Sequence, residues 1–91
     1  MAKPVKIEVV AGTIIVDPDE IHVSFSKKEE VHWTHKGGKN FSVEFRTSPF
    51  KDSHFDDAKS NSGAPIINKG TFKYTVSTEG ITKDPSVIID A

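Results

Sequence analysis

The sequence predicts an all-β protein in which six or seven antiparallel strands pack in two layers. Hydrophobic residues recur at every second position along most of the chain, which is the period of a strand with one buried face. The apolar segments follow one another closely with no helical pattern between them, and this spacing favours antiparallel pairing in two layers. Because 91 residues make one domain, we expect residues 1–91 to share a single core.

Each expected strand places large apolar side chains on one face. The inward residues, in chain order, are Val5, Ile7 and Val9; Ile14 and Val16; Ile21, Val23 and Phe25; Val31 and Trp33; Phe41, Val43 and Phe45; Phe72, Tyr74 and Val76; and the closing run Val87 to Ile89. The strongest hairpin signal is Gly37-Gly38, because paired glycines reach positive φ without a steric penalty. We expect Trp33, the largest of the inward side chains, in the middle of the core.

The segment of residues 47–69 is polar and irregular, and we expect it to form one long loop. Ser48-Pro49 favours a short helical turn through residues 52–55, because serine accepts hydrogen bonds from free amides and proline suits the first helical position. Phe50 and Phe55 lie in this loop. They either anchor the loop to the core, which we favour, or form an exposed apolar patch for a partner.

Composition excludes several classes of function. Twelve basic residues stand against 13 acidic ones, so no basic excess favours nucleic acid or a membrane surface. No segment has the length and hydrophobicity for membrane insertion, and the first residues lack the apolar core of a signal peptide. The chain has no cysteine, which excludes disulfides and thiolate chemistry.

Several segments together resemble the cupredoxin family. They are Asp17-Pro18, Val31-His32-Trp33, the run Phe41 to Phe45, the run Gly70 to Val76, and Asp84 to Ile89, so the resemblance covers roughly residues 5–90. It is closest to small bacterial cupredoxin-like domains that lack the metal. The resemblance implies a Greek-key β-sandwich and a periplasmic location, and in true cupredoxins this sandwich carries electrons through one copper ion.

The chain departs from the family at the metal site. A type 1 copper site needs two histidines, a cysteine thiolate and usually a weak axial methionine. The resemblance places the later ligands in the stretch Val76 to Lys83, which contains no Cys, His or Met, and the only methionine is Met1. Blue-copper electron transfer is thereby excluded, and we expect no cofactor.

The histidines leave a metal-binding alternative open. His22 and His32 have outward parity on strands that we expect to be adjacent, so the two rings would hold Zn²⁺ or Cu²⁺ weakly with Glu20 or Glu30 as a third ligand. The alternative is that both are solvent-exposed strand residues. His35 has the inward parity of Trp33 and ends its strand beside the glycine turn, where a hydrogen bond to a loop would hold it partly buried.

No nucleophile elbow, phosphate-binding loop or zinc-protease motif is present, so we expect a non-enzymatic binding module. Its partner, a protein or a small molecule, is not identifiable from sequence, and we expect a monomer or weak dimer. Loops on a rigid sandwich usually carry recognition. We therefore expect the interaction surface at His35, Lys36, Phe50 and Phe55, beside Gly37-Gly38 and residues 78–83. The alternative function is weak Zn²⁺ or Cu²⁺ binding through His22, His32 or His35.

Overall fold

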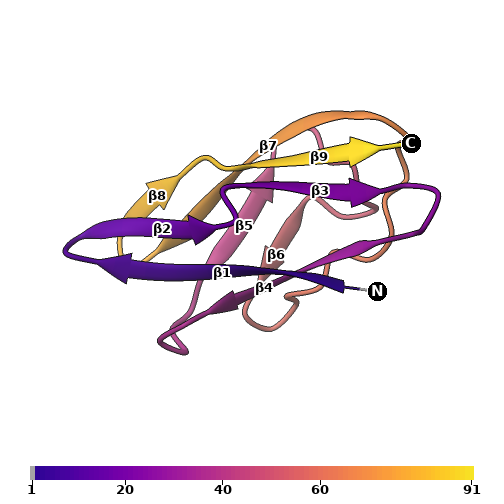
Figure 1. Ribbon diagram of the computed structural model, residues 1–91. Coiled ribbons are helices and arrows are strands. Elements are labelled where there is room, and N and C mark those ends of the chain that lie inside the picture. The colour runs from indigo at the N-terminus through magenta and orange to yellow at the C-terminus, as the bar shows by residue number, and fades with distance from the viewer. Residues whose placement is uncertain (1) are drawn as a thin grey trace.

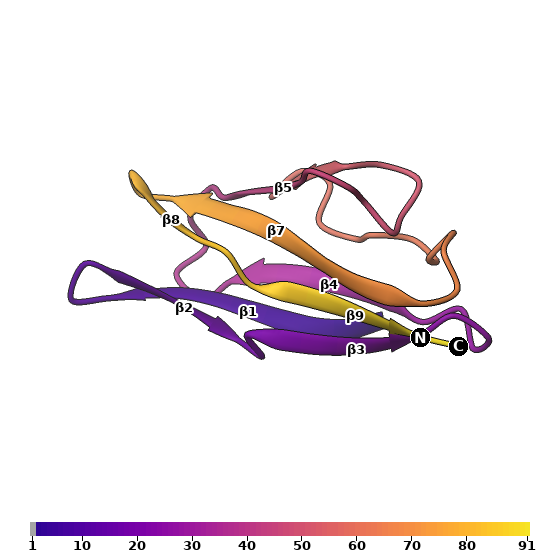
Figure 2. The same cartoon turned by 90° about the horizontal axis from the view of Figure 1, so that it is seen from above.

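The computed structural model describes residues 2–91 as two sheets packed face to face, with no helix in that range (Figure 1). The strands are β1 (Ala2–Val10), β2 (Thr13–Asp17), β3 (Glu20–Ser24), β4 (Glu30–His35), β5 (Ser42–Phe45), β6 (His54–Asp56), β7 (Gly70–Thr78), β8 (Ile81–Lys83) and β9 (Ser86–Asp90). The predicted all-β class and the two layers are confirmed (Figure 2). The predicted number of strands is too low, because β6 and β8 have three residues each and are too short for an alternating pattern.

Both sheets are mixed, so the prediction of wholly antiparallel pairing is wrong. The first sheet has the order β2-β1-β4, and the second has the order β3-β9-β7-β5-β6 with β8 beside β7. β1 runs parallel to β4, and β3 runs parallel to β9. Both parallel pairs join segments that are distant in the chain, and the period of a strand carries no information about its distant neighbour.

Two tight hairpins are present, but neither is at the predicted position. β1 and β2 are joined by Ala11 and Gly12, with φ of 51° and 78°, and β7 and β8 by Glu79 and Gly80, with φ of 51° and 80°. Positive φ at both central residues is the geometry of a two-residue hairpin turn. Gly37-Gly38 instead lies between β4 of the first sheet and β5 of the second, so the glycines join the two layers.

The core lies between the sheets and is centred on Trp33, as predicted. The Trp33 side chain is fully buried, its ring centroid is 5.1 Å from that of Phe55 and 5.7 Å from that of Tyr74, and its Nε1 donates to the Tyr74 hydroxyl at 3.3 Å. The other inward residues predicted on β1 to β5 are buried, with Val9 and Phe25 as exceptions. Val9 is only partly buried against the core, and Phe25 lies at the exposed turn after β3.

The long loop packs onto this core without a helical turn, so that prediction is wrong. The Ser48 hydroxyl accepts the Phe50 amide and donates to the Asp52 carbonyl, and this pair of bonds forms a side-chain turn. The chain then enters β6, which pairs with β5. Phe50 and Phe55 are 2% and 0% exposed, so they anchor the loop and form no apolar patch.

The outer edge of β3 is covered by two charged side chains from elsewhere in the fold. Lys3 Nζ donates to the His22 carbonyl at 2.8 Å, and Glu29 Oε1 accepts the Ser24 amide at 2.7 Å. The hydrogen bond from the Ser24 amide, together with the Lys3 ammonium 3.4 Å away, holds the pKa of Glu29 below its ordinary value despite the burial of this side chain. These contacts occupy backbone groups through which an edge strand would pair with another chain.

We expect Phe50→Ala and Phe55→Ala each to lower the free energy of unfolding by about 3–5 kcal/mol, because each leaves a cavity in the core. Ile66→Ala is the control within the same loop, since Ile66 is 63% exposed. We expect it to change stability by less than about 0.5 kcal/mol. Urea unfolding followed by the fluorescence of the single tryptophan gives all three values. Losses for the two phenylalanines no larger than the control's would show that the rings are not packed.

Candidate functional site

Three chain connections meet at one end of the molecule, on the left in Figure 1. They are the β1–β2 turn, the segment between β4 and β5, and the β7–β8 turn. Ile7 of β1 lies opposite His35 of β4, and the Thr78 hydroxyl at the end of β7 donates to the Asn40 carbonyl at 2.8 Å. We call residues 35–40 together with residues 79–80 the His35 end.

His35 is the buried polar side chain of this end. Its side chain is 4% exposed, and Nδ1 accepts the Gly37 amide at 2.9 Å. A ring nitrogen that accepts a hydrogen bond carries no proton, so the neutral ring is protonated at Nε2. Nε2 lies 3.4 Å from a carboxylate oxygen of Glu79, but it makes no hydrogen bond within residues 2–91. His35 therefore presents a buried donor that the fold leaves without a partner, an arrangement that usually costs stability.

Exposed charges surround this donor. Lys39 Nζ lies 3.9 Å from the Glu79 carboxylate, and Lys36 Nζ lies 3.0 Å from that of Glu8. The side chains of Lys36 and Lys39 are 71% and 62% exposed, and ion pairs as exposed as these contribute little stability. Both ammonium groups are accessible to a partner at small energetic cost.

A shallow hollow of about 200 Å³ lies beside β4 at the His35 end. Its lining includes Lys39 and Phe41 from the segment before β5, and Asp57 and Ser60 from the long loop. The long loop therefore borders this end through residues after β6. Phe50 does not border it, because this ring packs against Phe45 at the opposite end of β5.

Only two of the four residues of the predicted interaction surface lie together at the His35 end. Lys36 is exposed as expected, and His35 lies at the same end but is buried. Phe50 and Phe55 do not belong to an exposed surface, so their assignment as contact residues is wrong. Both rings fill core volume that the short strands leave open, because a small domain needs every large side chain in its interior.

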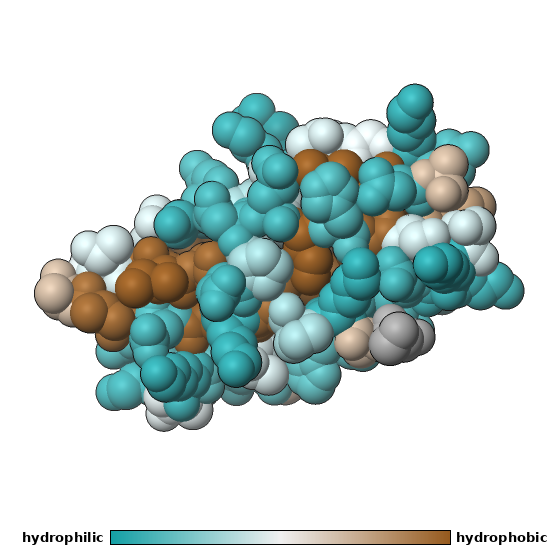
Figure 3. All heavy atoms as spheres, in the orientation of Figure 1, coloured by the Kyte–Doolittle hydropathy of each residue, from teal (hydrophilic) through white to brown (hydrophobic). Residues whose placement is uncertain are grey.

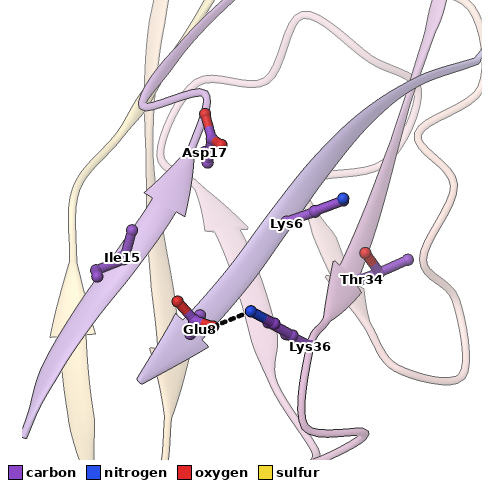
Figure 4. Close-up of a pocket in the computed structure, with 6 residues that line it drawn as sticks. All are labelled: Lys6, Glu8, Ile15, Asp17, Thr34 and Lys36. Carbon is purple, nitrogen blue, oxygen red and sulfur yellow. Dashed lines mark ion pairs between the residues drawn. The ribbon is translucent and has the colours of Figure 1, made fainter. Parts of the chain in front are cut away.

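A second hollow, of about 350 Å³, lies on the outer face of the first sheet (Figure 4). It is lined by side chains from all three strands and from the residue that follows β4: Lys6, Glu8, Ile15, Asp17, Thr34 and Lys36. Glu8 and Lys36 form the ion pair described above. The hollow is a polar depression with one apolar wall, Ile15, which is 42% exposed.

The histidines proposed as metal ligands lie apart. His22 is in β3 of the second sheet with Nδ1 3.1 Å from an Asp90 carboxylate oxygen, whereas His32 is in β4 of the first sheet with Nε2 3.2 Å from the Ser60 hydroxyl. The expectation that His22 and His32 face each other is therefore wrong, because β3 and β4 do not pair. Residues 2–91 contain no group of three His, Asp or Glu side chains placed to hold a metal ion.

The sequence analysis placed residues 78–83 beside His35 but did not single out Glu79, and it did not identify Lys6 and Asp17 on the sheet face. Glu79-Gly80 carried a local signal, since a residue followed by glycine between two β segments is typical of a tight turn. For Lys6 and Asp17 the alternation predicts only that each side chain points outward from its strand. Their shared position depends on the β1–β2 register, which the alternation does not determine.

Comparisons of the chain with protein-family models, curated proteins and solved structures find no match. Among residues 2–91 no helix is long and apolar enough to cross a membrane. Function is therefore inferred from the geometry of the two surfaces.

We expect the neutral ring of His35 to carry its proton on Nε2 and none on Nδ1, because Nδ1 accepts the Gly37 amide. His22 is the internal control: its Nδ1 faces the Asp90 carboxylate, which favours the opposite tautomer. Long-range ¹H–¹⁵N correlation spectra assign both rings. A proton on Nδ1 of His35 would contradict the geometry of the His35 end.

Proposed function

We propose that this chain is a non-enzymatic, copper-free cupredoxin-like domain that binds a partner through the His35 end. The observation that carries the proposal is the buried Nε2 donor of His35, which lies where two loops meet and has no hydrogen-bond partner in residues 2–91. Unsatisfied buried polar groups are rare in folded proteins, and a binding role accounts for this one.

The cupredoxin-like Greek-key assignment is supported by sequence patterns and by the arrangement of the layers. The chain passes from the first sheet to the second between β2 and β3, returns for β4, and crosses again before β5. Copper is left out of the proposal because the chain has no cysteine, so no thiolate is available to form a type 1 site.

Binding is favoured over catalysis because the polar groups that catalysis would need already form hydrogen bonds with other partners. Nδ1 of His35, the ring position that would act as a base, is engaged by the Gly37 amide. The hydroxyl of Thr78, which precedes Glu79, donates to the Asn40 carbonyl. A general base and its nucleophile need to face each other within hydrogen-bond distance, and these two groups face other partners.

In the proposed complex, Nε2 of His35 would donate a hydrogen bond to an oxygen of the partner after the Glu79 side chain turns away. Lys36 and Lys39 would then contact acidic or carbonyl groups around that acceptor. Because the Glu79 side chain is 35% exposed and its two contacts are long, its displacement costs little. The partner chemistry that fits this end is a surface rich in carbonyl and carboxylate oxygens.

Site-specific photo-crosslinking in the source cell tests the proposal. A photoreactive side chain replaces Lys39 at the His35 end in one variant, and Lys27, which is exposed in the turn before β4 at the opposite end, in a matched control. We expect a discrete covalent adduct from position 39 and none from position 27. We also expect His35→Phe, which removes the donor but keeps a ring, to abolish the adduct. No adduct at position 39, equal adducts at both positions, or an adduct that does not depend on His35 would refute the proposed site.

A further inference from the structure

We propose that the outer face of the first sheet binds a second copy of this chain across a two-fold axis, with Lys6 of each copy against Asp17 of the other. This contact goes beyond the proposed function, because it uses a sheet face and not the His35 end. It is a further interaction surface, and its occupant follows from the charges and apolar side chains that the face exposes.

The outer face carries one unpaired charge of each sign. Lys6 and Asp17 lie directly opposite each other in the β1–β2 register, so they share the outer face. Nevertheless, no ion pair joins either of them to another group in the described part of the chain, and Figure 4 shows the Lys6 amine pointing away from Asp17 toward Thr34. Glu8 and Lys36, on the same face, are paired at 3.0 Å. The face therefore offers one free ammonium and one free carboxylate.

An apolar patch lies next to these charges. Val10 and Ile15 are 48% and 42% exposed, and the register places them diagonally across β1 and β2 on the outer face. Figure 3 shows apolar residues gathered at this end of the molecule, over the β1–β2 hairpin. Together these two β-branched side chains form a small apolar patch that a second copy would cover.

A two-fold axis that runs along the strands, between β1 and β2, satisfies both features at once. Rotation about this axis places β1 of one copy over β2 of the other without shifting position along the strands. Lys6 then meets Asp17 of the second copy, and the reciprocal pair forms on the other side of the axis. The same rotation places Val10 over Thr13 and Ile15 over Glu8 of the second copy, so the two apolar patches lie side by side at one end of the interface.

Other occupants suit this face less well. The hollow is open and its lining contains no aromatic ring, so a sugar has no surface on which to stack, and a small zwitterion would be contacted from one side only. The net charge of −1 adds little long-range repulsion between two copies. Because only β1 and β2 face the second copy across this axis, the interface is small and the dimer belongs to the weak class.

The direction of the two-fold axis determines where the two His35 ends lie in the dimer. An axis along the strands keeps the two copies pointing in the same direction, so both His35 ends would lie at the same side of the dimer. If the proposed function is correct, the dimer would present two partner sites side by side, and a repetitive or dimeric partner would bind with avidity.

Charge exchange between two variants tests the contact in purified protein. Sedimentation equilibrium at protein concentrations up to about 1 mM, which covers the weak end of specific association, measures the dimer dissociation constant. Lys6→Glu alone places Glu against Asp17, and Asp17→Lys alone places Lys against Lys6. We expect each variant to dimerise at least about tenfold more weakly than the native chain.

An equimolar mixture of the two variants restores both attractive pairs, so we expect a heterodimer within about threefold of the native dissociation constant. Lys73→Glu, an equal charge change at an exposed position of β7 in the second sheet, is the control and should change nothing. A native chain that stays monomeric, or a mixture that fails to associate, would overturn the proposal.

Amide chemical shifts of the native chain provide a measurement that needs no variant. Concentration-dependent shifts should cluster at Lys6, Val10, Ile15 and Asp17, and shifts elsewhere would contradict the assigned face. The proposed function and this contact can fail separately, because the crosslinking experiment reports a foreign partner at position 39 and sedimentation reports self-association without one.

Discussion

The aromatic cluster around Trp33 is the constraint on which the rest of the structure depends. Trp33 is fully buried between the sheets, contacts Phe45, Phe55 and Tyr74, and donates its indole hydrogen to the Tyr74 hydroxyl. A chain of this length buries only about 60–65% of its unfolded surface, so its large rings have to fill the interior. This requirement draws the long loop onto the core through Phe50 and Phe55.

A filled interior restricts function to the outside of the molecule. Within residues 2–91 the one buried side-chain polar atom without a hydrogen-bond partner is Nε2 of His35, and the sheet face adds the exposed charges of Lys6 and Asp17. The first lies under loops and suits a foreign partner. The second lies on a regular sheet, is self-complementary and suits a second copy. Lys36 belongs to the His35 end and also lines the sheet face, so the two surfaces adjoin at that residue, whereas His35 lies apart from Lys6 and Asp17.

Much of the core was predictable from the sequence, because strand parity depends only on neighbouring residues. Val43, Phe45, Tyr74 and Val87 are buried where the alternation places them. Strand pairing was not predictable, since the partners of a strand are set by packing between distant segments. The same reason explains the separation of His22 from His32, which parity alone had placed on one face.

The candidate site was predictable only in part. His35 was identified from its inward parity beside a glycine turn, and the structure adds the Gly37 bond that determines its tautomer. Its neighbour Glu79 comes from the β7–β8 turn, which lies far along the chain from His35. No local pattern connects two such residues, because their proximity results from the packing of one sheet on the other.

The ionisation of Tyr74, the only tyrosine in the chain, tests most directly whether the aromatic core excludes water. Burial, opposed by the Trp33 hydrogen bond, raises the pKa of Tyr74 from 10.0 to about 12. A group with a raised folded pKa stabilises the fold fully below its unfolded pKa, and this contribution is lost as pH rises through the folded value. An ultraviolet absorbance titration should therefore show a midpoint near pH 12 accompanied by unfolding. A midpoint near pH 10 in a chain that keeps its folded circular dichroism would contradict the account.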